Sequence, residues 1–533
     1  MAHINALDRL FLCNKAPGPQ ESFELNEAIA SLTHQIDDRN EEIKQLEHKR
    51  SCYRAVCSPI RRIPAEVLGL IFELSLSMPL DHLGRRDLVA ISLTCQAWRS
   101  AALEARSLWS GVTLESCKCF DYGFAEITYM HDEEYEKVLA WFQRSGGAPK
   151  TLEYRLSQSS CRCFAGSRCT ISNPTVERLI REGPSLDRFL LQVSSVGCLR
   201  KWPILTRTPS TSAVALPGWS ALRSFSIIFC DSDDHLWDDE DGKKSIFNLF
   251  PDCSSFELSL PRRAFAFDEE VDSLTEGINI PDRVLASIKT FSIVWDWDGD
   301  QLSRILPRCT SLTRLSVDLT KRSNPFGRRQ TLIPPYTSAQ SSITLPKLRE
   351  FVLSNGDFAI LDLIRAPALE ILDLEVNAAS EGSQDDIEKL RRFMRTSSLT
   401  MSLRNLTIRG LVGNAGVVDL SLPVLGSLKI LVLDSPHVSS YHLGEPVVTS
   451  VDGQWCFRHP SLVDLRLMNL CRSEDTLVSE LDFLANRRLS DVPCVISVKF
   501  HDAPRFSQAE LTARATHAKS GCLFVSLYPS SVS

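Results

Sequence analysis

The sequence predicts an α/β protein, in which an N-terminal helix and a small all-helical module precede an irregular α/β solenoid. Three observations favour this fold class: a heptad stripe near the start, a helical stretch of about 50 residues after it, and a recurring motif of the form L-x-x-L-x-L. A length of 533 residues exceeds what one compact core usually needs, so several modules or a repeat array are expected.

The composition is that of a folded chain, with 43% hydrophobic and 23% charged residues. A net charge of -7 gives no basic surface for phosphate backbones, so we expect no nucleic-acid partner. The most apolar stretch, 68–80, is broken by Glu73 and Pro79, so we expect no membrane span and no membrane partner. The first residues lack the pattern of a secretory signal, and 17 dispersed cysteines fit a reducing compartment, cytoplasmic and/or nuclear, without disulfides.

Residues 1–20 are expected to form a flexible N-terminus, and residues 21–54 a helix with a heptad stripe. Arg39 is the one polar break in that stripe. The apolar heptad positions are Leu25, Ile29, Leu32, Ile36, Ile43 and Leu46. Two interpretations stay open: a short coiled coil that makes a homodimer through residues 25–46, or a helix that packs back on its own chain.

Residues 58–110 read as two or three short helices. Pro64 stands where the first turn of a helix tolerates proline, and Leu68, Ile71 and Phe72 then share one face. A second run with helical periodicity covers 87–99 and continues to a second tryptophan at Trp109.

These residues resemble the F-box, whose pattern is a Leu-Pro-x-Glu-Leu-like opening, an Ile-Phe pair, and a Leu-x-x-Cys-x-x-Trp-like stretch that ends near a second tryptophan. The matching segments, in order, are Ile63-Pro64-Ala65-Glu66-Val67-Leu68, Ile71-Phe72, Ser92-Leu93-Thr94-Cys95, Trp98-Arg99 and Leu108-Trp109. The sequence departs from the pattern at Ile63, where leucine is usual, and in a longer link at 77–86 between the first two helices.

The resemblance implies a small helical module whose exposed apolar face binds a Skp-type adaptor, which connects it to a cullin-RING ubiquitin ligase. A module of this size has little core of its own, so an uncovered apolar face favours a partner. By resemblance, the residues of the adaptor-binding surface or its support are Pro64, Glu66, Leu68, Ile71, Phe72, Leu93 and Trp98. The alternative is an ordinary helical hairpin that caps the next domain.

Residues 111–505 carry nine copies of the L-x-x-L-x-L motif, several of them preceded by proline. The copies are Leu186-Phe189-Leu191, Leu222-Phe225-Ile227, Ile288-Phe291-Ile293, Leu312-Leu315-Val317, Leu348-Phe351-Leu353, Leu369-Leu372-Leu374, Leu403-Leu406-Ile408, Leu428-Leu431-Leu433 and Leu462-Leu465-Leu467. Stretches of helical character lie between them, at 301–306, 358–364, 385–395 and 476–486. Strands that alternate with helices or turns predict a parallel sheet.

This pattern resembles leucine-rich repeats and implies an irregular leucine-rich-repeat-like α/β solenoid after the all-helical F-box. The spacing between copies runs from 21 to 66 residues, and the longest gap predicts a degenerate copy around 256–258. A helix at 134–144 and a strand at 152–156 would form a first, atypical repeat, and 506–533 a C-terminal tail. The alternative is a non-repeat α/β domain whose strands share the motif.

No catalytic motif or cofactor fingerprint is present, so we expect a non-catalytic protein without cofactors. Cys117, Cys119, Cys161, Cys163 and Cys169 suggest zinc by residue type. Their C-x-C spacing is tighter than that of a zinc knuckle, so we expect no metal and interpret them as buried or loop thiols.

Taken together, these features predict the substrate receptor of a Skp-cullin-F-box ubiquitin ligase, which binds the adaptor through its F-box and an unknown target protein through its repeats. The alternative is a repeat scaffold or binding protein whose F-box-like helices pack internally and recruit no ligase. An enzyme with an unrecognised site in the repeat domain is the least favoured hypothesis.

Overall fold

The computed structural model describes most of the chain between residues 16 and 527. The described ranges are 16–116, 124–156, 169, 173–202, 204, 216–230, 247, 250–260, 279–294, 301–319, 342–356, 358–376, 383–410, 422–434, 447–448, 455–456, 459–470, 494–500 and 521–527. Two compact units divide the chain: a helical unit of residues 1–77 and 84–105, and a sheet unit of residues 78–83 and 106–533.

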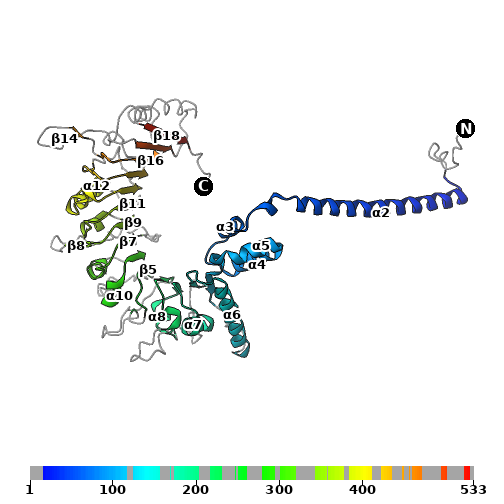
Figure 1. Cartoon of the computed structure of the whole chain (residues 1–533), viewed down its shortest axis with the longest axis horizontal. Helices are drawn as coiled ribbons and strands as arrows, with labels where there is room; N and C mark the ends of the chain where they lie inside the picture. The colour runs from blue at the N-terminus through cyan, green and yellow to red at the C-terminus, as the bar shows by residue number, and fades with distance from the viewer. Residues whose placement is uncertain are drawn as a thin grey trace. The chain divides into compact units, whose positions relative to one another are not determined.

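The helical unit begins with α2, a single helix of 38 residues from Pro19 to Val56 (Figure 1). Its start is specified locally, because Pro19 opens the first turn and the Glu21 carboxylate accepts a 2.8 Å hydrogen bond from the Gly18 backbone N–H. No residue of α2 is buried. Within the helical unit, α2 therefore does not pack back on the other helices.

Three short helices and a 3-10 turn follow α2, as the sequence predicts. They are η1 (Pro59–Arg62), α3 (Ala65–Ser75), α4 (His82–Thr94) and α5 (Gln96–Glu104). Pro64 is the N-cap of α3, and its carbonyl accepts the first intrahelical hydrogen bond, 3.0 Å from the Leu68 N–H. Gly69 brings α3 close to the end of α5, since a Cβ there would lie 3.2 Å from that of Ala105.

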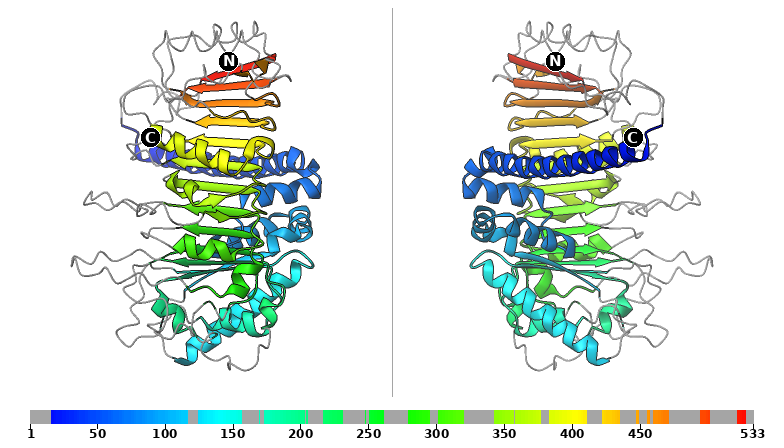
Figure 2. Two further views of the ribbon diagram at one scale, coloured as in Figure 1. Left: turned by 90° about the vertical axis from the view of Figure 1, so that its left-hand side faces the viewer. Right: turned by 90° about the vertical axis from the view of Figure 1, so that its right-hand side faces the viewer.

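The sheet unit is built on one parallel sheet of 14 strands, which lie side by side in chain order (Figure 2). Its strands are β1 (Gly111–Glu115), β2 (Thr151–Arg155), β3 (Arg188–Val193), β4 (Ser224–Phe229), β5 (Ser255–Ser259), β6 (Thr290–Val294), β7 (Arg314–Asp318), β9 (Glu350–Gly356), β11 (Ile371–Val376), β12 (Asn405–Arg409), β13 (Ile430–Asp434), β16 (Asp464–Leu470), β17 (Cys494–Phe500) and β18 (Gly521–Leu527). Two small sheets pair β8 (Ile343–Thr344) with β10 (Ile364–Arg365) and β14 (Val447–Val448) with β15 (Trp455–Cys456).

All nine copies of the motif end in a strand of this sheet, and the degenerate copy predicted around 256–258 is β5. The parallel register aligns equivalent motif positions across neighbouring strands, so their apolar side chains face the same side and are buried. From β3 to β6 the second motif position is a stack of phenylalanines, Phe189, Phe225, Phe256 and Phe291. Successive ring centroids lie 5.8, 6.1 and 6.1 Å apart.

Helices lie along one face of the sheet (Figure 1). They are α6 (Phe124–Arg144), α7 (Pro174–Glu182), α8 (Val196–Arg200), α10 (Asp282–Ser287), α11 (Gln301–Ile305) and α12 (Ser383–Thr396), with 3-10 turns η2 (Arg106–Trp109), η5 (Pro217–Trp219), η7 (Leu306–Arg308), η8 (Phe358–Asp362) and η9 (Leu399–Met401). The predicted helix at 358–364 is therefore a 3-10 turn followed by β10, and the one predicted at 476–486 lies outside the described residues.

Two parts of the chain extend the sheet beyond the predicted repeats. At the C-terminal end, β18 lies inside the predicted tail and pairs in parallel with β17 from Gly521 to Leu527. At the other end, β1 comes before the first predicted strand, and Trp109, just ahead of β1, packs on Trp141 of α6 with 4.5 Å between ring centroids and 51° between the ring planes. This tryptophan of the F-box pattern belongs to the sheet unit.

The link between α3 and α4 also belongs to the sheet unit. Leu80 is fully buried and forms a parallel bridge with Val112 of β1. Its N–H donates to the Gly111 carbonyl at 3.3 Å, and its carbonyl accepts from the Thr113 N–H at 2.9 Å. The extra length at 77–86, which departs from the F-box pattern, therefore supplies backbone pairing along the outer edge of β1.

Candidate protein-binding surface

Helix α3 carries an exposed apolar stripe. Val67, Leu70, Ile71 and Leu74 are 43%, 57%, 44% and 88% exposed, and their i, i+3, i+4, i+7 spacing places them on one side of the helix. We call these four residues the α3 stripe. An uncovered row of this kind is typical of a protein contact, because burying it removes apolar area from water.

The opposite side of α3 is the core of the helical unit. Leu68 and Phe72 are buried there, and the Phe72 ring packs on Trp98 of α5 with 5.2 Å between centroids. Leu88 of α4 is also fully buried. The core side holds the helix in place, so the α3 stripe is presented on a fixed support.

The structure divides the seven predicted adaptor-binding residues between surface and core. Ile71 and Leu93 are exposed apolar residues, Leu93 at 75%, and Pro64 and Glu66 are exposed at the start of α3. Leu68, Phe72 and the half-buried Trp98 support the helix from inside.

Sequence reasoning did not single out Val67, Leu70 and Leu74. The signal was available, because the α3 sequence AEVLGLIFELS is apolar around most of its circumference, with Glu66 and Glu73 on the remaining side. A helix at the surface of a small module can bury only one of its faces.

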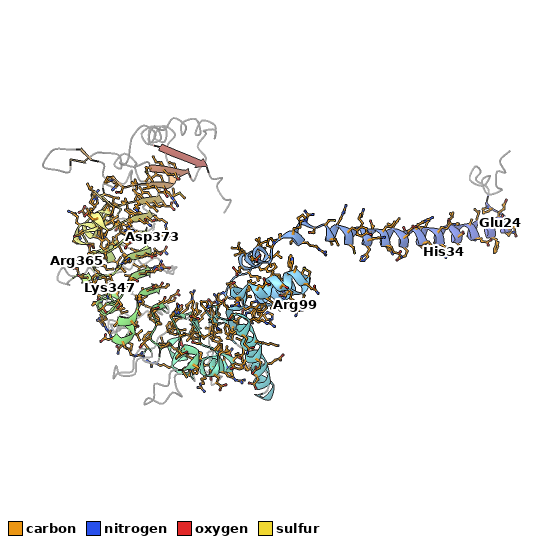
Figure 3. All side chains as sticks on the ribbon, in the orientation of Figure 1. Glu24, His34, Arg99, Lys347, Arg365 and Asp373 are labelled. Atoms are coloured by element: carbon orange, nitrogen blue, oxygen red, sulfur yellow. The ribbon has the colours of Figure 1, made fainter. Side chains whose placement is uncertain are left out.

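A second exposed apolar row runs along α2. Ile29, Leu32, Ile36, Ile43 and Leu46 are between 53% and 59% exposed. Figure 3 shows the polar side chains of Glu24 and His34 on the same helix.

The face of the sheet away from the helices carries polar and charged side chains beside apolar ones such as Val352 and Val432. In Figure 3, Asp373 of β11 lies on this uncovered face, whereas Lys347 and Arg365 lie on the other side of the sheet. Ion pairs join its strands: Arg314 of β7 donates to Glu350 of β9 at 2.6 Å, and Arg409 of β12 contacts Asp373. From β5 to β16 the acidic side chains outnumber the basic ones, with Glu257, Asp318, Glu350, Asp373, Glu375, Asp434 and Asp464 against Arg314, Arg409 and Arg466.

Asp373 is a partly buried carboxyl of this face. Burial raises its pKa above the ordinary aspartate value, and the Arg409 guanidinium acts in the opposite direction. Its Oδ2 atom pairs with Arg409, while its buried Oδ1 atom has no hydrogen-bond partner among the residues that the structure describes. Among the described residues, the carboxylate therefore has a partner for one of its two oxygens.

Among the described residues, no group of three or more His, Cys, Asp or Glu side chains is placed to hold a metal ion. Cys169 is buried, and the other four cysteines that suggested zinc lie outside the described residues. Cys52, Cys57, Cys95, Cys253, Cys309 and Cys494 are free thiols. No helix in the described part of the chain is both long and apolar enough to span a bilayer.

The helical unit and the start of the sheet unit match a known protein family. A family model described as F-box-like matches residues 60–115, from η1 through β1. This match supports an F-box protein. A search of curated proteins found no match to the chain.

Proposed function

We propose that this chain is a non-catalytic substrate receptor of a Skp-cullin-F-box ubiquitin ligase, acting in the cytoplasm and/or nucleus. The α3 stripe, within the F-box-like region, binds the Skp-type adaptor. The uncovered face of the sheet binds a target protein. Catalysis then comes from proximity, since the target is held near the ubiquitin-charged enzyme rather than transformed on this chain.

The α3 stripe is the observation that carries the proposal. Four large apolar side chains on one exposed side of an 11-residue helix have no cover within the described chain. Burying one such side chain contributes about 1.5–3 kcal/mol, so a partner helix or groove over the stripe gains enough to bind. The alternative scaffold function, in which these helices pack internally, requires this stripe to be covered by the chain itself.

The target-binding part rests on the sheet. Parallel strands in chain order, helices on one face and the aligned motif support a leucine-rich-repeat-like solenoid, whose uncovered face offers an extended row of strand side chains. The excess of acidic over basic side chains on this face favours a target of complementary, basic charge.

Adaptor binding is tested with the purified full chain and a recombinant Skp-type adaptor by isothermal titration calorimetry. Leu70→Glu with Leu74→Glu should weaken binding at least 100-fold, because two charges would be buried in the contact. Both side chains point away from the core, so the circular dichroism spectrum and the melting temperature should stay unchanged.

A matched control keeps the test specific. Met401 of η9 is 80% exposed in the sheet unit, and Met401→Glu should leave adaptor affinity unchanged. If the wild-type chain fails to bind any Skp-type adaptor, the ligase function is wrong and the scaffold alternative gains support.

A further inference from the structure

The unpartnered row on α2 identifies a second contact. Heptad position a holds Ile29, Ile36 and Ile43, and position d holds Leu25, Leu32 and Leu46. Alternating Ile and Leu layers are the core of a coiled coil, and the stripe from Leu25 to Leu46 covers about three heptads of the 38-residue helix. A lone exposed helix of this kind has no tertiary packing to stabilise it, so it gains stability from a second helix.

The charge along α2 is polarised. Residues 19–43 hold seven acidic residues and one basic residue, a net charge of 1 - 7 = -6, whereas residues 44–56 hold four basic residues and one acidic residue, a net charge of 4 - 1 = +3. The acidic residues of the first part are Glu21, Glu24, Glu27, Asp37, Asp38, Glu41 and Glu42. A helix that complements the charge of α2 places its basic residues beside the acidic part of α2. A second copy of α2 does this when it runs in the opposite direction.

We propose that α2 binds α2 of a second copy of this chain as an antiparallel coiled coil. With Pro19 of one helix opposite Val56 of the other, Ile29 meets the partner's Leu46, and Leu32 meets the partner's Ile43. By symmetry this gives four apolar layers. The basic end of each helix then lies beside the acidic part of the other. The two helix dipoles point in opposite directions, which is the favourable side-by-side arrangement.

A parallel pair in register is disfavoured by the same residues. The flanking positions would place Glu42 against the partner's Glu47 and Lys49 against the partner's Arg54. Arg39 at position d would also face its own copy across the core. In the antiparallel pair, Lys49 instead lies beside the partner's Ala28 and close to the partner's Glu24.

The polar break at Arg39 is accommodated at the edge of the stripe. Its guanidinium pairs with Glu42 at 2.6 Å within the same helix, so the charge lies toward the flank while the aliphatic stem covers the core position. The antiparallel alignment places Ile36 of the partner opposite it. A polar residue at one core layer costs some stability and fixes the register.

Sedimentation equilibrium of the full chain tests the contact. Wild type should be a concentration-dependent dimer, and Ile29→Asp with Ile43→Asp should be monomeric at all concentrations. Circular dichroism of the same variant reports whether its helices persist. A wild-type chain that stays monomeric throughout would overturn the proposal, whatever its adaptor affinity.

Orientation is tested by Lys49→Glu, because the two arrangements predict opposite signs. In the antiparallel dimer this substitution puts a new carboxylate beside the acidic part of the partner, and the dissociation constant should rise about three- to fivefold. In a parallel dimer it would create an attractive pair with Arg54, and tighter association would therefore contradict the antiparallel arrangement. Lys44→Glu makes the same charge change at a position outside the core flanks and should have a smaller effect.

Discussion

Gly111, the first residue of β1, lies against Pro79 in the link between α3 and α4. A Cβ at this position would lie 2.9 Å from the Cβ of Pro79, closer than real side chains approach. Gly111→Ala should therefore lower the free energy of unfolding by about 1–3 kcal/mol, measured by chemical denaturation, because Pro79 or β1 must shift. Gly147→Ala, where nothing lies within 4 Å, is the control and should change stability by less than about 0.5 kcal/mol. Equal effects of the two substitutions would rule out close packing as the cause.

Two buried thiols give the sheet unit a defined response to alkaline pH. Burial raises the pKa of Cys253 and of Cys309 from 9.0 to about 12. The unfolded chain releases these protons first, so the free energy of unfolding should fall as pH rises from about 9 towards 12, and this contribution is fully present below pH 9.

The measurement compares wild type with Cys253→Ala/Cys309→Ala in urea at several pH values. The wild type should lose more stability above pH 9 than the double variant. Parallel pH dependences would contradict the assignment.

Cys52, Cys57 and Cys95 are exposed and should react with iodoacetamide in the folded chain, while the two buried thiols should not.

The stack of four phenylalanines provides buried ring contacts between successive strands from β3 to β6. Phe256 packs between Phe225 and Phe291 and is buried, so Phe256→Ala should cost about 3–5 kcal/mol of unfolding free energy by removing packing on both sides. Val352→Ala, on the uncovered face of β9, should cost about 1 kcal/mol or less in the same urea titration. A small loss from Phe256→Ala would mean that the stack contributes little.

The strands were predictable where the motif repeats its apolar positions. Leu372 and Leu374, for example, are two apart and both buried, as period-two alternation requires. The strands β1, β17 and β18 do not follow the full motif, so the repeat pattern could not indicate them. Their period-two alternation was a local signal, but short apolar runs alone do not fix pairing.

For α3, the sequence did not show which apolar residues are exposed and which are buried. Sequence similarity identified the module, yet it could not separate Phe72, which packs inside, from Leu70, which is exposed, because both are large apolar residues on the same short helix. Deciding which face is covered requires the position of α5, and the contact of Gly69 with Ala105 that brings α5 near is not visible in periodicity.

At the scale of the whole molecule, we expect α2 to be separable from the structure that follows it. None of its residues is buried in the chain, so removing residues 1–56 should leave the melting temperature of the rest unchanged in scanning calorimetry at low protein concentration. Adaptor binding should also persist, because the α3 stripe lies outside the deleted segment. A marked loss of stability would mean that α2 packs on the chain in solution.

The bridge between Leu80 and β1 affects how the two units can be exchanged by recombination. The chain passes from the helical unit to the sheet unit at residue 78, returns at residue 84 and leaves again at residue 106. A crossover after residue 105 would therefore transfer the helical unit whole, but it would also take residues 78–83, which border β1, away from the rest of the sheet unit. We expect homologous chains that keep this link to carry both units together, rather than exchange the F-box as an independent cassette.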